Sequence, residues 1–144
     1  MKSKNLVLCI MLVLSLTLVL SGCQTSSYTA ILKDNVLEVS SQNSDKGFLS
    51  GSGTFVVEEG QQIVIESKLE KGELTLKFIP FAAAGDENAS SEDLEKAANS
   101  GNAAAEQVIK SAGTITLDIA PGDYNITVEA NSDKTTGTLT VSAK

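Results

Sequence analysis

Apolar and polar residues alternate one by one over most of the chain after residue 27. In segment 113–119, for example, Ile115, Leu117 and Ile119 share one side, and polar residues occupy the other. Alternation with a period of two is typical of β-strands that bury one face. The segments with a strand-like pattern are 28–32, 36–40, 48–57, 62–69, 73–81, 113–119, 123–130 and 137–143.

Turn-forming residues separate these segments, as at Lys33-Asp34-Asn35 and Ala120-Pro121-Gly122. Gly51 and Gly53 interrupt one segment and predict a bulge or a close backbone approach there. Strands at this spacing predict an all-β fold, a small antiparallel β-sandwich or jelly-roll-like domain of about seven or eight strands with a short Ala-rich helical insert.

Two stretches of the chain share one order of features. Residues 60–76 and 122–141 each contain a glycine, a strand, a turn, a second glycine and a second strand. Two similar hairpins that pair face to face would give this echo, and chance or shared β-strand composition explains it equally well. The second stretch, "PGDYNITVEA" followed by "TGTLTV", resembles the last hairpin of extracellular Ig-like and related β-sandwich modules, which implies a fold but no function.

Residues 82–112 break the strand pattern and are rich in Ala, Asn, Ser, Gly and Glu. The sequence predicts that this insert is partly helical or disordered, with two short helices. Ser90 would cap the first helix with Asp93 at position N3, and Gly101 would end it. Asn102 would cap the second helix, which needs to dock on the sheet. Its apolar face would consist of Ala105, Val108, Ile109 and Ala112.

The N-terminus has a different pattern, in which an apolar run at 6–20 follows Lys2 and Lys4. That length suits the core of a signal peptide and is short for a membrane span, which needs about 20 residues. The run ends at Leu20-Ser21-Gly22-Cys23. This tetrapeptide, in this position, resembles the lipobox of bacterial lipoprotein signal peptides. An ordinary signal peptide with an accidental cysteine and an uncleaved membrane helix are the alternatives.

The resemblance implies that Cys23 carries a diacylglyceryl thioether and that cleavage between Gly22 and Cys23 makes Cys23 the mature N-terminus. Residues 1–22 would then be the signal peptide, 23–27 a lipidated tether and 28–144 the β-sandwich domain. Acyl chains of this kind give stable attachment, because each buried methylene contributes about 0.8 kcal/mol. We expect the protein at the extracytoplasmic face of the cell membrane. As an arginine-free, lysine-using chain with a lipobox, it resembles small lipoproteins of Gram-positive Firmicutes. In a host with two membranes, Gln24 after the cysteine does not resemble the aspartate-type retention signal, and the outer membrane is the alternative location.

Charge narrows the choice of partners. Beyond residue 22 the chain has nine lysines and no arginine against eighteen acidic residues, a formal charge of −9. Such a surface repels nucleic acid and anionic lipid, so no nucleic acid partner is expected. A cationic peptide, a divalent ion or a basic protein patch is acceptable electrostatically.

The residue types exclude several chemistries. The chain has no His and no Trp, so Ser-His-Asp and Cys-His nucleophiles and histidine zinc sites are ruled out. Cys9 would leave with the signal peptide. Asp86-x-Asn88-x-Ser90 starts like a calcium loop but has Ser91 and Ala97 where glycine and a bidentate glutamate are required. We therefore predict no enzyme, no metal and no cofactor.

The aromatic residues are few and suit structural roles. At 4% of the chain and without Trp, they do not build a sugar-stacking platform. Core positions are expected for the phenylalanines, and Tyr124 is expected at a sandwich edge with its hydroxyl bonded. The sequence thus favours a membrane-anchored module that binds a protein or peptide. The alternative is capture of a small ligand or cation with residues 82–112 as a lid.

Overall fold

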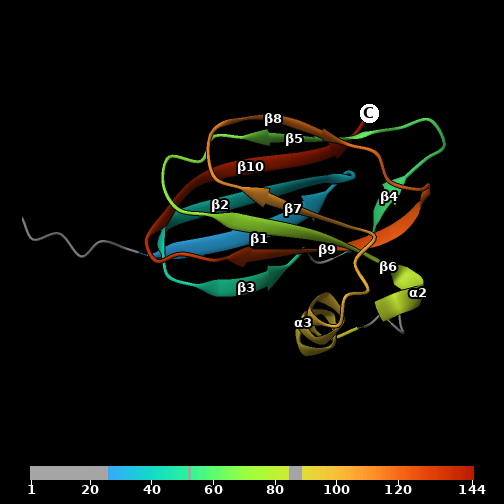
Figure 1. The fold of residues 1–144 in the computed structure, drawn as a ribbon, viewed down its shortest axis with the longest axis horizontal. Coiled ribbons are helices and arrows are strands. Elements are labelled where there is room, and N and C mark those ends of the chain that lie inside the picture. The colour runs from blue at the N-terminus through green and yellow to red at the C-terminus, as the bar shows by residue number, and fades with distance from the viewer. Residues whose placement is uncertain (1–25, 52, 85–88) are drawn as a thin grey trace, which may run out of the picture.

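The computed structural model describes residues 26–51, 53–84 and 89–144, which fold into two antiparallel sheets packed face to face (Figure 1). Sheet I has the order β1(Ser27–Lys33), β2(Val36–Ser44), β10(Thr135–Ala143), β5(Ile63–Ser67) and β8(Gly113–Leu117). Sheet II has the order β3(Gly47–Ser50), β9(Gly122–Ala130), β6(Leu74–Pro80) and β7(Ala105–Ile109), and β4(Phe55–Val57) also pairs with β9. Helices α2(Phe81–Ala84) and α3(Ser91–Asn99) lie between β6 and β7 in the chain.

The strand pairs are nested in sequence. The outermost pair is β2 with β10, and the next is β3 and β4 with β9; β5 then pairs with β8, and β6 with β7. A chain folded back on itself in this way and wrapped into two sheets is a jelly roll. The predicted all-β, antiparallel, jelly-roll-like domain is confirmed. The described strands number ten, because segment 48–57 splits in two and β7 was not predicted.

The alternating apolar residues fill the space between the sheets. Leu37 and Val39 of β2 are buried there with Leu139 and Val141 of β10. Phe55 and Phe78 also lie in this core with ring centroids 6.2 Å apart, as predicted, whereas Phe48 and Phe81 are only partly buried and lie outside it. A contiguous apolar core of this kind is the main source of stability in a domain of this size.

The two predicted hairpins are wrong. Strand β5 lies in sheet I and β6 in sheet II, while β9 lies in sheet II and β10 in sheet I, so both connections cross between sheets. The two crossovers pack on each other, with Asn131 N donating to the Glu73 carbonyl oxygen at 3.0 Å. Gly72 has a positive φ of 92°, and a Cβ there would lie 2.5 Å from Thr135 Oγ1. The echo in the sequence therefore marks two equivalent crossovers, because turn residues alone do not specify whether a chain stays in its sheet.

The glycines between β3 and β4 have the predicted effect. Gly51 is buried, and its N–H donates to the Ile126 carbonyl oxygen at 3.0 Å. A Cβ at Gly51 would lie 2.9 Å from Leu37 Cδ1. This close backbone approach lets one edge of sheet II break into two short strands.

The prediction for the insert at 82–112 is half right. The helix capped by Ser90 exists as α3, with the predicted capping box to Asp93. It packs through Leu94, Ala97 and Ala98, which are buried. The second predicted helix is wrong, because residues 105–109 form strand β7 along the edge of β6. Pairing five residues with the edge of β6 stabilises this segment more than a short helix would, because an isolated helix of this length is not stable.

The N-terminal predictions lie outside the described residues. These are the signal peptide at 1–22, the cleavage site at Gly22 and the lipidated Cys23. The first described strand starts at Ser27, the last residue assigned to the tether. Within the described ranges, no helix is long and apolar enough to cross a membrane.

Candidate functional site

The outer face of sheet I carries the most exposed large apolar side chain among the described residues. Ile31 of β1 is 60% exposed. Its neighbours on this face are mainly polar: Thr29, Glu38, Ser40, Thr138 and Thr140. We call these six residues the Ile31 face. Single exposed apolar side chains are common on soluble proteins, so Ile31 is a candidate contact residue because of the hollows beside it.

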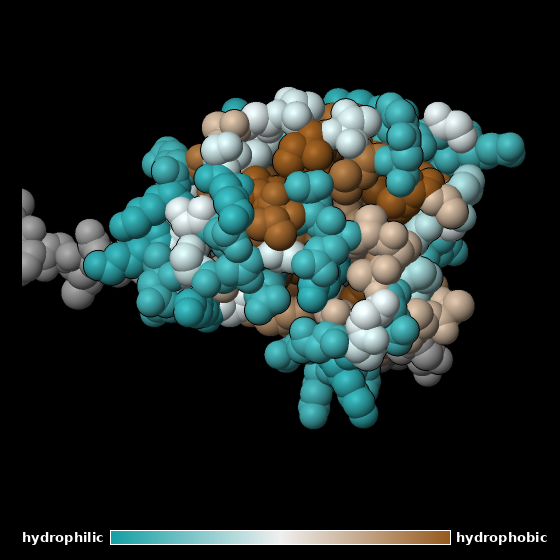
Figure 2. Space-filling model, viewed as in Figure 1, coloured by the Kyte–Doolittle hydropathy of each residue, from teal (hydrophilic) through white to brown (hydrophobic). Residues whose placement is uncertain are grey.

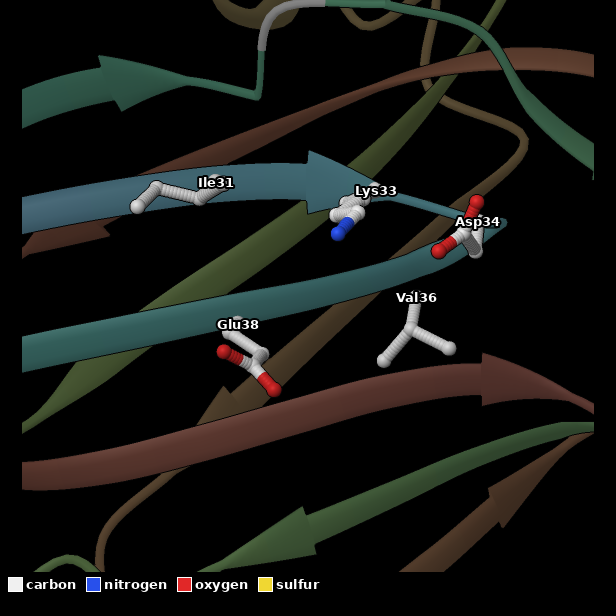
Figure 3. Close-up of a pocket in the computed structure, with 5 residues that line it drawn as sticks. All are labelled: Ile31, Lys33, Asp34, Val36 and Glu38. Carbon is white, nitrogen blue, oxygen red and sulfur yellow. The ribbon is translucent and has the colours of Figure 1, made fainter.

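Two shallow hollows flank Ile31, each with a volume of about 280 Å³. One is lined by Ile31, Lys33, Asp34, Val36 and Glu38, whose side chains are drawn in Figure 3. The other runs across β1, β2 and β10 and includes Thr138 and Thr140. Ile31 and Glu38 line both hollows, because they are opposite each other in the β1–β2 ladder. A ligand on this face would therefore contact both.

The β1–β2 hairpin holds these residues in a regular array. Asp34 and Asn35 have positive φ values of 51° and 58°, which is a two-residue turn of type I′. The ladder then runs without a shift from Lys33↔Val36 to Ser27↔Gln42. Because the pleat alternates, Tyr28, Ala30 and Leu32 face the core, and Ile31 faces solvent.

The outer edge of β1 is unpaired by any described strand. The residues that flank a two-residue turn are a bonded pair, so Lys33, Ile31 and Thr29 direct their backbone groups to β2. The N–H and C=O groups of Tyr28, Ala30 and Leu32 then point away from β2. Seven residues of regular edge, without Pro or a bulge, have no described strand paired on their outer side.

The other edges among the described strands are shorter or closed. Strand β3 has four residues and β4 has three, while β7 and β8 have five each. The β4 edge is also closed by the turn of the neighbouring hairpin. Asn35 Nδ2 donates to the Val56 carbonyl oxygen at 2.8 Å, and Val56 N donates to Asn35 Oδ1 at 2.7 Å. An edge closed by a side-chain amide cannot add a strand at that residue.

A second apolar area lies at the opposite side of the sandwich. Figure 2 shows apolar side chains between β8 and β7. Ile115 and Leu117 of β8 are partly buried and pack against the core, and Val108 of β7 is 37% exposed. These β8 side chains complete the core between the sheets, whereas Ile31 stands on an outer face and has no such role.

The outer face of sheet II is covered by α3, which belongs to the segment predicted as a lid. Ile79 packs against Ala97, Ala98 and Phe48. Lys77 Nζ donates to the Ala98 carbonyl oxygen at 3.2 Å, near the end of the helix. Asn125 is opposite Ile79 in the β6–β9 ladder, and its Nδ2 is buried with no hydrogen-bond partner. A polar group is therefore buried at the ladder position opposite Ile79.

The tyrosines have structural roles. The Tyr124 hydroxyl donates to the Ala120 carbonyl oxygen at 2.6 Å, which confirms the predicted bonded tyrosine at a sandwich edge. Burial raises the pKa of Tyr28, and the charge of Glu129 adds to this effect. Its hydroxyl is buried without a hydrogen-bond partner. A phenol held neutral in this way supplies no base or nucleophile.

The described polar side chains form few clusters of the kind used for metal binding or catalysis. Of the described residues, no three His, Cys, Asp or Glu side chains come together as a possible metal site. Asp86 and Asn88 of the incomplete calcium loop lie outside the described residues. The Ile31 face itself offers one apolar side chain, four hydroxyls and one carboxylate, which suit binding by contact.

Sequence reasoning did not single out Ile31, although its signal was present. Once Tyr28, Ala30 and Leu32 are assigned to the core side, the alternation places Thr29 and Ile31 on the solvent side. An isoleucine on a solvent side otherwise rich in Thr and Ser is a departure from the pattern. The edge position of β1 was not accessible in this way, because it depends on the strand order.

No protein-family model matches this chain. No curated protein matches it either. Among solved structures, the crystal structure of PirA is 18% identical, covers 78% of this chain and 95% of its own, and has a TM-score of 0.45. A carbohydrate-binding module, CBM6cm-2 of Cellvibrio mixtus lichenase 5A in complex with cellotriose, is 11% identical over 81% of this chain and 86% of its own (TM-score 0.40). The Drosophila melanogaster CENP-C cupin domain is 10% identical over 85% of this chain and 82% of its own (TM-score 0.34). Likeness at this level identifies neither a family nor a ligand.

Proposed function

We propose that this protein is a lipid-anchored, non-enzymatic module on the extracytoplasmic face of the cell membrane, and that it binds another protein through the Ile31 face. The observation that carries the proposal is Ile31 itself, a large apolar side chain that is 60% exposed between two hollows. The absence of His and Arg from the sequence supports a binding role over catalysis.

The anchor is supported by the sequence Leu20-Ser21-Gly22-Cys23 after a charged and apolar leader. Only residues 24–26 separate Cys23 from β1, and three or four extended residues reach roughly 10 to 14 Å. The Ile31 face would therefore lie close to the membrane surface. Its partner must be a protein that is held at, or reaches, that surface.

Metabolic labelling with a clickable palmitate analogue tests the anchor. In a Gram-positive host we expect label on the wild-type chain and none on the Cys23→Ala variant. Absence of label on the wild type, or equal label on both, would end this part of the proposal. Mass spectrometry of the labelled chain then locates the new N-terminus, expected at residue 23.

Site-specific photo-cross-linking tests the binding face. A photoreactive amino acid at Thr138, beside Ile31, should give a discrete adduct in cells, and the Ile31→Ser substitution should remove it. The matched control places the same probe at Val108, on the other side of the sandwich, where no adduct of that mass is expected. Identical adducts from both positions, or none from Thr138, would contradict the proposal.

A second candidate function follows from Asn125. Its unpaired amide is opposite Ile79, the residue on which α3 packs, and a small ligand that displaced the helix as in the predicted lid could bond to it. In that case a panel of sugars and divalent ions should contain a compound that raises the melting temperature of the wild type and not of Asn125→Ala. A panel without such a compound favours the protein-binding role.

A further inference from the structure

The free edge of β1 lies beside the Ile31 face, and we infer that it binds an extended, basic segment of the partner protein as an added antiparallel strand. This inference rests on the proposed function and names the mode of binding and the chemistry of the ligand. Strand addition to an exposed sheet edge is a recurring mode of peptide recognition, in which backbone hydrogen bonds give affinity and alternate side chains give specificity.

The turn at Asp34-Asn35 determines which backbone groups an added strand meets. The groups of Tyr28, Ala30 and Leu32 point outward, so they bond to the ligand. The ligand residues opposite Thr29 and Ile31 form the closer, non-bonded pairs, with Cα atoms about 4.5 Å apart. One side chain of the ligand therefore packs directly on Ile31, and this contact buries it.

The chemistry of the hollows selects the ligand's charge. Asp34 and Glu38 outnumber Lys33 in the hollow beside the edge. Over the chain beyond residue 22, eighteen acids face nine lysines. A basic segment gains from this field, whereas a second copy of the same acidic domain, paired through its own β1, is repelled.

A synthetic peptide as long as β1, seven residues that alternate valine with lysine, is the probe. Binding is followed by amide hydrogen exchange, by NMR, in the full chain held in detergent micelles. We expect exchange to slow at Tyr28, Ala30 and Leu32 and to stay unchanged at Thr29 and Ile31, whose amides already bond to β2. A peptide with glutamate in place of lysine should bind more weakly, and one with a central proline should not bind.

Two substitutions, Ala30→Pro and Ile31→Ser, distinguish binding by the β1 edge from binding by the Ile31 face. Ala30→Pro removes one outward N–H while leaving the Ile31 side chain, and an edge strand tolerates proline where its N–H faces solvent. It should weaken peptide binding about tenfold, because it removes a backbone hydrogen bond and disturbs its neighbours. Should Ala30→Pro fail to fold, the exchange pattern of the wild type still decides the question.

The outcomes distinguish this inference from the proposed function. Loss of the cellular adduct with Ile31→Ser but not with a folded Ala30→Pro would overturn strand addition and leave the face as the binding site. Loss with neither variant would overturn both. Equal binding of the glutamate peptide, uniform slowing along β1 or dimerisation of the chain through β1 would also overturn the basic-strand inference.

Discussion

Two isoleucines on the outer faces of the two sheets have opposite environments. Ile31 on sheet I is 60% exposed, whereas Ile79 on sheet II is 0% exposed. Both side chains point away from the central core, so strand alternation alone would leave both in water. The difference is α3, which lies over Ile79 and buries it with Ala97 and Ala98.

The comparison shows that this chain has the means to cover an outer face and does so on one side. The helix that covers Ile79 has a complete capping box and an apolar side made by Leu94, Ala97 and Ala98. The described residues contain no such cover over Ile31. Ile31 stays exposed where its counterpart is covered, and the proposed contact with a partner rests on this contrast.

The largest expected effect on stability comes from truncating Ile79, and truncating Ile31 provides the contrast. Ile79→Ala should lower the free energy of unfolding by about 3 kcal/mol, because it leaves a cavity beneath α3. Ile31→Ala should cost less than about 1 kcal/mol, since water already surrounds the side chain. Chemical denaturation of both variants measures the difference. Equal losses would mean that Ile31 is buried in the folded protein and would break the comparison.

Undocking the helix should have the next largest effect. Leu94→Ala should cost about 2 kcal/mol, the lower end for a buried leucine, because α3 can separate while the sheets persist. Hydrogen exchange should speed up in α3 and stay slow in the core strands β6 and β9. The exposed neighbour Glu95 offers the control, Glu95→Ala, which should leave exchange in α3 nearly unchanged.

The cap of α3 should contribute less. Ser90 Oγ accepts from Asp93 N at 3.2 Å, and Ser90→Ala removes that bond at a cost of about 1 kcal/mol in helix stability. Ser91→Ala is the matched control: Ser91 is inside the helix and caps nothing, and the change removes one exposed hydroxyl contact with Ser50 Oγ at 3.5 Å. Far-UV circular dichroism and exchange in α3 report the change. A cap effect on sheet I as well would show that the two faces are coupled.

Acid should destabilise α3, and this effect should be the smallest of the four. The Ser90 side chain and then the Ser90 backbone N–H, both bonded to the Asp93 carboxylate, hold the pKa of Asp93 below its usual range. Because the folded pKa is the lower one, the stabilisation is full above the unfolded pKa. It is lost as the pH falls through the folded pKa. Exchange in α3 should therefore rise below about pH 4 in the wild type.

Asp93→Asn provides the control for that titration. It removes the titrating carboxyl group, so its exchange in α3 should lack this pH dependence once the intrinsic chemistry of exchange is subtracted. A wild-type profile that matches the variant would show that the capping box does not contribute to α3.

Much of the fold could be predicted because local pattern and burial agree. The alternating segments, the buried phenylalanines, the Gly51 approach and the Ser90 cap each depend on neighbours in sequence. The strand β7 could not be predicted in the same way, since Ala105 to Ile109 fit a helix until β6 offers an edge. Hairpins were expected in place of the crossovers at Gly72 and Ser132 for a similar reason, because turn residues do not determine which sheet the next strand joins.

The site was less accessible to sequence reasoning than the fold. Cys23 followed from a short motif with its own local chemistry, and it remains a prediction. Ile31 required knowledge that sheet I has no cover in the described structure, and its edge position required the strand order. Such properties depend on residues distant in the chain, which a single sequence without its fold does not place.

The position of β10 between β2 and β5 has a consequence for how this protein is made. Until Thr135–Ala143 is available, β1 with β2 and β5 with β8 are two separate ladders, with no strand to join them. Sheet I is therefore completed by contacts between β2 and β10, segments about a hundred positions apart, and contacts of this kind are slow to form. Synthesis of the chain from its N-terminus would keep these two ladders of sheet I apart until β10 emerges.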